Sequence, residues 1–232
     1  MKYAVPVPIV PTLAIIGKSE RFPVNRVFCV GRNYEAHIRE LGLDPEREPP
    51  FFFMKPSTAV ISVEGDNIII PYPSMTNDYQ HEIELVVAIK TGGSDINEKQ
   101  ALEHVLGYAI GLDMTRRDLQ LIARDMGRPW EFGKSFAFSA PIGPIYPTSE
   151  VGHLTDAGIN LDVNGRTRQT SNLSELIWSV PEIIACLSKY DELQAGDLIM
   201  TGTPEGIAAV VAGDVMCGRI AGLGEIVVTI GH

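Results

Sequence analysis

The 232-residue sequence lacks several features that would assign it to a class at once. It has no basic run, because 19 Lys and Arg face 29 Asp and Glu, which gives a net charge of −10 and a pI of about 5.0. A chain without a basic patch is poorly suited to nucleic acid or an anionic membrane surface, so we expect neither as a partner. No apolar stretch reaches the roughly 18 residues of a membrane-spanning helix, so we expect no such helix.

Cysteine is scarce, and its spacing excludes a disulfide framework. Cys29, Cys186 and Cys217 are odd in number, far apart and without C-x-x-C spacing, so we predict reduced core thiols in a cytoplasmic protein. The hydrophobic start carries three prolines and lacks the basic start and cleavage site of a signal peptide. We expect residues 1–25 to form an N-terminal arm or strand, followed by one catalytic domain over residues 26–232.

Several common nucleotide and nucleophile motifs are also missing. The segment "VGRNY" (30–34) does not have the G-x-G-x-x-G spacing of a dinucleotide loop. There is no G-x-S-x-G and no P-loop, which removes the α/β-hydrolase and phosphate-binding hypotheses.

The patterns that are present predict an α+β fold that is mostly β. Hydrophobic runs bounded by Gly and Pro indicate strands at 27–31, 67–73, 82–89, 107–114, 197–202 and 224–230. A hairpin is expected around Asn164-Gly165. Helical spacing covers 34–43, 115–127 and 173–190, and residues 97–110 begin as a helix capped by Asn97 before passing into a strand.

Glu82 and Glu84 lie two residues apart in an otherwise apolar strand, "QHEIELVVAI". Side chains at i and i+2 share one face, so the two carboxylates repel each other unless a positive group lies between them. With Asp113 at the end of another buried strand, they form a set of hard oxygen ligands that suits Mg²⁺ or Mn²⁺. The alternative is an exposed strand face with two solvated glutamates. His81 points to the opposite face, and we expect it to be structural.

Three further features have both a catalytic and an ordinary interpretation. His37 and Glu40, three apart on a predicted helix, are either a general base with its orienting carboxylate or a surface pair. Lys134 is either an oxyanion donor or a solvated lysine. The segment "LIMTGTPEGIA" (198–208) is either a carboxylate-binding turn or a plain β-turn.

Taken in order, eight segments resemble the fumarylacetoacetate hydrolase family. They are "CVGRNYEAHIRELG", "PPFFFMKPSTAV", "HEIELVVAI", "GYAIGLDMTRRDLQ", "RPWEFGKSF", "LDVNGRTRQ", "ELIWSVPEIIA" and "GDLIMTGTPEGIA". The likeness runs from about residue 26 to 230 and is to the short single-domain branch, which lacks the separate N-terminal domain of longer members. The segments "GLDPEREPPFFF" and "LDMTRRDLQ" look most like members that hydrolyse fumarylpyruvate and other acylpyruvates.

The resemblance implies a fold and a metal site. The fold would be a mixed β-sandwich roll assembled as a homodimer, with Mg²⁺ or Mn²⁺ on Glu82, Glu84 and Asp113. The helix with His37 and Glu40 would be a lid that carries the water-activating pair.

The resemblance also implies contacts to a small 2,4-dioxo acid. Lys134 falls on the family's active-site lysine, Arg117 and Gln120 on substrate contacts, and Thr203 in the turn that holds the substrate carboxylate. The implied reaction cleaves a carbon–carbon bond of an acylpyruvate, with fumarylpyruvate giving fumarate and pyruvate. Alternatives on the same site are oxaloacetate decarboxylation and 2-oxo acid isomerisation, and a metal-binding protein without activity is a third. The presence of both His37 and Glu40 favours hydrolysis.

Overall fold

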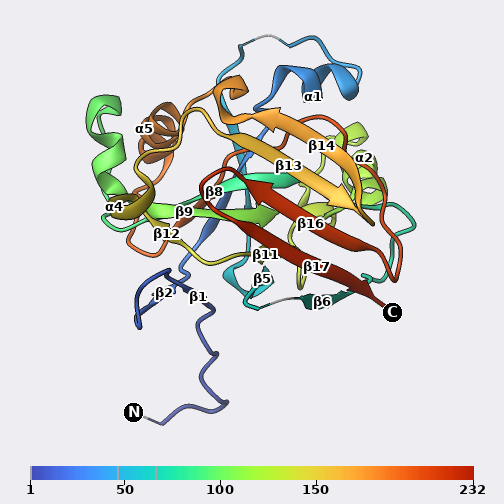
Figure 1. The fold of residues 1–232 in the computed structure, drawn as a ribbon, viewed down its shortest axis with the longest axis horizontal. Coiled ribbons are helices and arrows are strands. Elements are labelled where there is room, and N and C mark those ends of the chain that lie inside the picture. Colours follow the sequence, from blue (N-terminus) through green and yellow to red (C-terminus); the bar gives the residue numbers. More distant parts are fainter. Residues whose placement is uncertain (1, 46, 66) are drawn as a thin grey trace.

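The computed structural model describes residues 2–45, 47–65 and 67–232 and has the mostly β fold that the sequence predicts. A mixed eight-stranded sheet runs in the order β4 (Phe51–Lys55), β3 (Val27–Gly31), β15 (Leu198–Met200), β8 (Ile83–Ile89), β9 (Val105–Leu112), β11 (Ala140–Ile142) and β5 (Val60–Ser62), with β12 (Tyr146–Pro147) also paired to β9. A five-stranded sheet runs β14 (Arg166–Asn172), β13 (Gly158–Val163), β16 (Val215–Ile220), β17 (Glu225–Gly231) and β6 (Ile68–Pro71). The two sheets lie against each other in a curled roll, so the predicted fold class is confirmed (Figure 1).

Strand β8 is buried on both faces. Ile83, Leu85 and Val87 belong to the core cluster shared with the five-stranded sheet, whereas Val86 and Ala88 belong to a second cluster on the other face. Because side chains alternate, Glu82 and Glu84 extend the face of Val86 and Ala88. The two glutamates therefore look into the protein on the side away from the five-stranded sheet.

The helices are short and surround the sheets. They are α1 (Glu35–Glu40), α2 (Arg117–Asp125), α3 (Glu131–Lys134), α4 (Thr148–Val151) and α5 (Val180–Tyr190), with 3₁₀ turns η1 (Ser57–Ala59), η2 (Glu98–His104) and η3 (Leu173–Glu175). None in the described ranges is long and apolar enough to cross a membrane.

Three helix predictions need correction. The segment from Glu98 is a 3₁₀ rather than an α-helix, although Asn97 does accept the Lys99 N–H as its cap. Helix α2 begins at Arg117 rather than Thr115, because residues 115–116 pair as strand β10 (Thr115–Arg116) with β7 (Tyr79–Gln80). The segment 173–190 is not one helix, since α5 starts only after a capping box between Ser179 and Glu182.

The N-terminal segment leaves the body of the protein as an extended chain (Figure 1). Nearer the body, β1 (Thr12–Ala14) and β2 (Arg21–Pro23) form a small antiparallel pair, and Leu13 and Phe22 are buried in the second core cluster.

All three cysteines are free, as expected. Only Cys29 is a core thiol, however, and the prediction is wrong for Cys186 and Cys217, which are partly exposed. Cys186 lies on α5 and Cys217 on β16, at positions that their elements do not turn fully into a core.

Candidate active site

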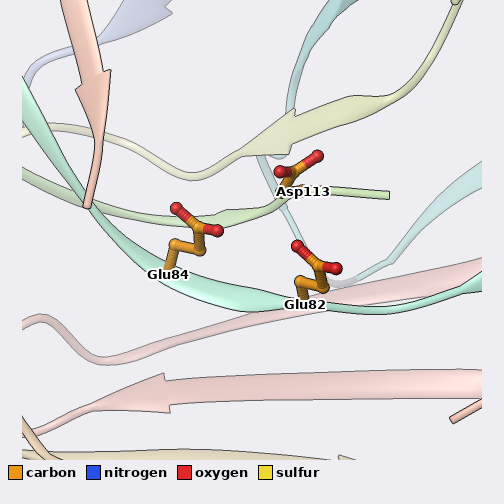
Figure 2. A group of neighbouring side chains, drawn as sticks. All are labelled: Glu82, Glu84 and Asp113. Atoms are coloured by element: carbon orange, nitrogen blue, oxygen red, sulfur yellow. The ribbon is translucent and has the colours of Figure 1, made fainter. Parts of the chain in front are cut away.

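The pairing of β8 with β9 brings the three acidic side chains together. Glu84 lies opposite Gly111, and Asp113 N–H donates to the Glu82 carbonyl at 2.8 Å, which extends the ladder past the end of β9. One oxygen from each of Glu82, Glu84 and Asp113 lies within 4.8 Å of the others, and the three residues are 5%, 1% and 0% exposed. Figure 2 shows the carboxylates rising from neighbouring strands into one space. The exposed-strand alternative is therefore wrong.

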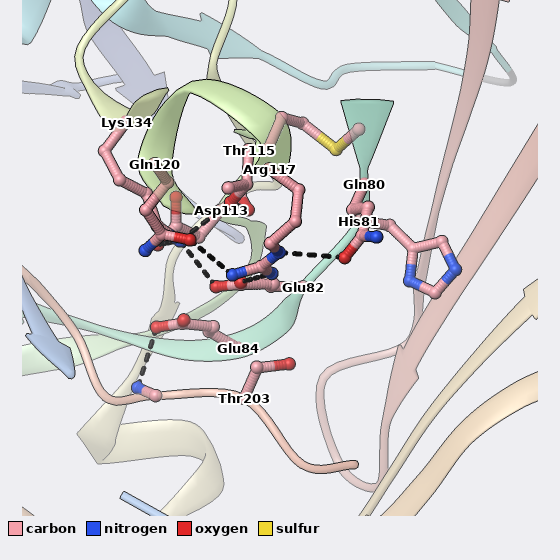
Figure 3. A network of polar contacts seen from close by, with 12 residues as sticks. Gln80, His81, Glu82, Glu84, Asp113, Thr115, Arg117, Gln120, Lys134 and Thr203 are labelled. Carbon is pink, nitrogen blue, oxygen red and sulfur yellow. Dashed lines mark hydrogen bonds and ion pairs between the residues drawn. The ribbon is translucent and has the colours of Figure 1, made fainter. Parts of the chain in front are cut away.

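Three cations surround two of these carboxylates. The Lys134 ammonium donates to Glu82 Oε2 at 2.7 Å, to Asp113 Oδ2 at 2.8 Å and to Thr115 Oγ1 at 2.7 Å (Figure 3). Arg117 forms a close ion pair with Glu82, and Lys55 Nζ lies 2.8 Å from Asp113 Oδ1. Lys134 is 2% exposed, which excludes the solvated lysine.

Glu84 is the carboxylate without a close cation in the described chain. Its Oε2 accepts only the Gly202 N–H, at 2.7 Å. Burial, together with the charges of Asp113 and Glu82, raises the pKa of Glu84 well above its usual value. Burial acts the same way on Glu82, but Lys134 and Arg117 outweigh it and hold that pKa well below its usual range.

This donor set fits a divalent cation. The ligands are hard carboxylate oxygens, and Asp113 Oδ1 is buried and makes no hydrogen bond to any described residue, although Lys55 lies near it. A cation among the three would also supply the charge that Glu84 lacks.

The predicted pair of His37 and Glu40 is formed on α1. His37 Nδ1 lies 3.2 Å from Glu40 Oε2, and Glu40 Oε1 accepts the Gly206 N–H at 3.0 Å. Burial would raise the pKa of Glu40, but the contacts with His37 and Gly206 outweigh it and lower that pKa. His37 is 5% exposed and lines the same pocket as the three carboxylates, so it is not a surface residue.

The turn at 201–206 connects these groups. Its Gly202 N–H bonds Glu84, its Gly206 N–H bonds Glu40, and the Thr203 side chain lines the pocket between them. Asn33, fully buried, donates to the Thr201 carbonyl at 2.8 Å and holds the turn beside β3. Sequence patterns alone do not distinguish the turn at 201–206 from a plain β-turn.

Eight of the nine predicted site residues line one pocket, and the ninth, Glu40, contacts the lining residue His37. Arg117 is held in place by Gln120 Oε1 and, at 2.9 Å, by Gln80 Oε1. Two more arginines, Arg32 and Arg124, lie in the lining.

Sequence patterns missed the residues that support the site. Lys55 is buried at the end of β4, Thr115 Oγ1 accepts a hydrogen bond from Lys134, and Asn33 and Gln169 hold the turn. The one local sequence signal for any of these residues is that Lys55 directly follows the apolar run "FFFM", which suggests a buried lysine. His81 points away from the carboxylates, as expected (Figure 3). Its Nδ1 lies 2.9 Å from Gln169 Oε1.

Known proteins share this sequence and fold. The family model "Fumarylacetoacetate (FAA) hydrolase C-terminal" matches residues 26–231. The chain is 50% identical over 190 residues to a fumarylpyruvate hydrolase of Ralstonia sp, covering 82% of this chain and 96% of that protein. It is 38% identical over 198 residues to a mitochondrial oxaloacetate decarboxylase of Dictyostelium discoideum, covering 85% and 89%. A crystal structure of fumarylpyruvate hydrolase from Pseudomonas aeruginosa, in complex with Mn²⁺ and pyruvate, superposes with a TM-score of 0.97 at 56% identity and covers 99% of both chains.

Proposed function

The chain belongs to the fumarylacetoacetate hydrolase family, and we propose that it is a divalent-metal-dependent hydrolase that cleaves fumarylpyruvate into fumarate and pyruvate. The fumarylpyruvate hydrolases at 50% and 56% identity support this substrate. The observation that carries the proposal is the meeting of a three-carboxylate cluster and the His37–Glu40 pair in one pocket. Such an enzyme would serve the breakdown of aromatic compounds.

We assign the metal to Glu82, Glu84 and Asp113, with Mg²⁺ or Mn²⁺ as the ion. When bound, such an ion supplies Lewis-acid chemistry to the 2-oxo group and carboxylate of the substrate. Lys134 and Arg117 hold Glu82 ionised as a ligand, and the Gly202 N–H orients Glu84.

His37 is the general base in this proposal. Glu40 contacts His37 Nδ1, which leaves Nε2 to take a proton from water. Hydroxide then adds to the carbonyl carbon of the fumaryl half, which is the ketone remote from the carboxylate of the pyruvate half. As the bond from that carbon to the methylene carbon breaks, the electron pair leaves with the pyruvate half, and protonated His37 can return its proton there. The helix α1 acts as the lid.

Lys134 is the proposed oxyanion donor. All three of its hydrogens bond Glu82, Asp113 and Thr115, so it must exchange one of these contacts to reach a developing oxyanion. Its pKa would fall through burial, but Asp113 and Glu82 outweigh that effect and raise it, so it stays charged.

Recognition of a dianion follows from the other lining residues. Thr203, Arg117 and Gln120 are assigned to the carboxylate end of the substrate. Arg32 and Arg124 make no contact with the carboxylate cluster in the described chain, and we assign them to the distal carboxylate of the fumaryl tail.

The assembly and the setting are also proposals. Exposed apolar side chains beside the site, Ile122 at 54%, Met126 at 58% and Phe132 at 82%, support a homodimer, which light scattering after gel filtration would measure. We propose a cytoplasmic enzyme, with residues 26–232 as the catalytic domain and residues 1–25 as an arm.

The test is pyruvate release from fumarylpyruvate with Mg²⁺ or Mn²⁺, run beside acetylpyruvate and oxaloacetate and repeated with EDTA. Chelator-sensitive cleavage of fumarylpyruvate is expected. Reaction with oxaloacetate alone would instead indicate the decarboxylase, which needs no attacking water and no use of His37.

A further inference from the structure

Gln169 is a fully buried side chain that reaches from β14 of the five-stranded sheet to the active-site turn. Its Nε2 donates to Thr203 Oγ1 and to the Pro204 carbonyl, both at 2.8 Å. Its Oε1 accepts the Ile83 N–H at 3.1 Å, between Glu82 and Glu84. One amide thus joins the metal-binding strand to the turn.

The network settles which way this amide points. A backbone N–H can only donate and a backbone carbonyl can only accept, so Ile83 and Pro204 fix Oε1 and Nε2 respectively. The same assignment gives His81 Nδ1 its hydrogen, because that nitrogen faces Oε1 at 2.9 Å. Every polar atom of the Gln169 side chain is then satisfied.

This orientation determines the role of the Thr203 hydroxyl. Because Oγ1 accepts a hydrogen bond from Gln169, its own hydrogen is left to donate elsewhere. In the ranges the structure describes, that hydrogen meets no other protein acceptor, and Thr203 lines the pocket. A hydroxyl whose hydrogen is free to donate suits a carboxylate.

We propose that Gln169 is a positioning residue that makes the Thr203 hydroxyl an obligatory donor to the substrate carboxylate. This rests on the proposed function, in which Thr203 holds that carboxylate. The turn lies close enough to β14 for this, since a Cβ on Gly206 would come within 1.9 Å of the Arg168 carbonyl. The turn and β14 are therefore in direct contact where the Gln169 side chain bridges them.

The test is a double-mutant cycle read by pyruvate binding to the Mn²⁺-loaded protein, measured by calorimetry. Gln169→Glu keeps the size and the acceptor and replaces the amide donors, so the Thr203 hydroxyl can turn to donate to residue 169. We expect the pyruvate Kd to weaken at least about tenfold, which is the effect of one lost hydrogen bond to a charged group. The Mn²⁺ affinity and the thermal midpoint serve as readouts of the scaffold.

In a Thr203→Val background the same Gln169→Glu change should raise the pyruvate Kd by less than about threefold, because no hydroxyl remains to orient. Gln100→Glu, on an exposed glutamine of η2, is the charge-matched control and should leave the Kd unchanged. If the buried carboxylate of Gln169→Glu prevents folding, Gln169→Met removes the donor to Thr203 Oγ1 without adding a charge, so the hydroxyl is no longer held as a donor and pyruvate binding should again weaken.

An unchanged Kd in Gln169→Glu would overturn the proposal, and so would equal weakening in both backgrounds. Loss of Mn²⁺ affinity by the same factor as pyruvate affinity would also overturn it, because Gln169 would then only support the strand. Pyruvate binding needs no turnover. A wild-type protein that fails to cleave fumarylpyruvate would thus count against the proposed function and not against this role of Gln169.

Discussion

Glu84→Gln should stabilise the metal-free protein while destroying its metal site. Glu84 has two carboxylate neighbours and no close cation among the described residues, and its pKa is raised by burial and by those neighbours. A neutral amide keeps the Gly202 N–H contact, because its carbonyl oxygen can accept in place of Oε2. The change therefore removes repulsion and leaves the backbone contact.

The size of the effect follows from proton linkage. A carboxyl whose folded pKa lies above its unfolded value binds an extra proton in the folded state, so stability falls as pH rises between the two values. The loss is about 1.4 kcal/mol for each pH unit above the unfolded pKa, for as long as the pH stays below the folded pKa. Coulomb repulsion between two charges no more than 4.8 Å apart, at an effective dielectric constant near 20, is at least about 3.5 kcal/mol.

Urea unfolding of EDTA-treated protein from pH 5 to 8 measures this effect. The advantage of Glu84→Gln should grow with pH, and added Mn²⁺ should stabilise the wild type but not the variant. Glu82→Gln is the matched control with the opposite sign, because it leaves buried Lys134 and Arg117 short of a partner and should destabilise by about 3 kcal/mol. If Glu84→Gln destabilises the metal-free protein as much as Glu82→Gln does, the charge-crowding account is refuted.

Three other variants test the roles in the pocket. His37→Ala should reduce fumarylpyruvate turnover at least about a hundredfold in a pyruvate-release assay with Mn²⁺ affinity unchanged, and wild-type rates would eliminate the general base. Arg124→Gln should raise KM for fumarylpyruvate about tenfold and leave KM for acetylpyruvate, which has no distal carboxylate, nearly the same; equal changes would contradict the tail assignment. Lys134→Met should lower kcat and also the metal-free stability, by about 3 kcal/mol in urea unfolding, since Glu82 and Asp113 lose a shared cation. An unchanged stability would argue against that ion-pair cluster.

Local patterns predicted the elements whose signals are local. The Asn164-Gly165 turn closes its hairpin with φ values of 52° and 73°, the left-handed conformation that this dipeptide favours. The apolar run that forms β8 is long enough to be recognised by itself. In contrast, β5, β11 and β12 have three residues or fewer, and they exist because β9 and each other offer backbone partners from distant parts of the chain.

The site residues likewise divide into those with a local sequence signal and those placed by contacts between distant parts of the chain. Spacing alone places Glu82 and Glu84 on one face, but it left their exposure open, because burial depends on β15 and β9 flanking β8. Lys55 could not be predicted as a partner of Asp113, since Lys55 ends β4, Asp113 follows β9, and these two strands are not neighbours in the sheet. The family resemblance supplied the remaining roles, and it too omitted Lys55, Asn33 and Gln169.

The turn at 201–206 links the carboxylate cluster to the His37–Glu40 pair. Its backbone bonds one proposed metal ligand, Glu84, and one member of the proposed base pair, Glu40, so the positions of the two groups are coupled through one short stretch of chain. Decarboxylation would use only the first of these bonds, whereas attack by water needs His37 at a defined distance from the metal site. A contact that orients Glu40 has no purpose in a protein that merely binds metal. The Gly206–Glu40 hydrogen bond therefore favours the hydrolase over the decarboxylase and over a protein that only binds metal.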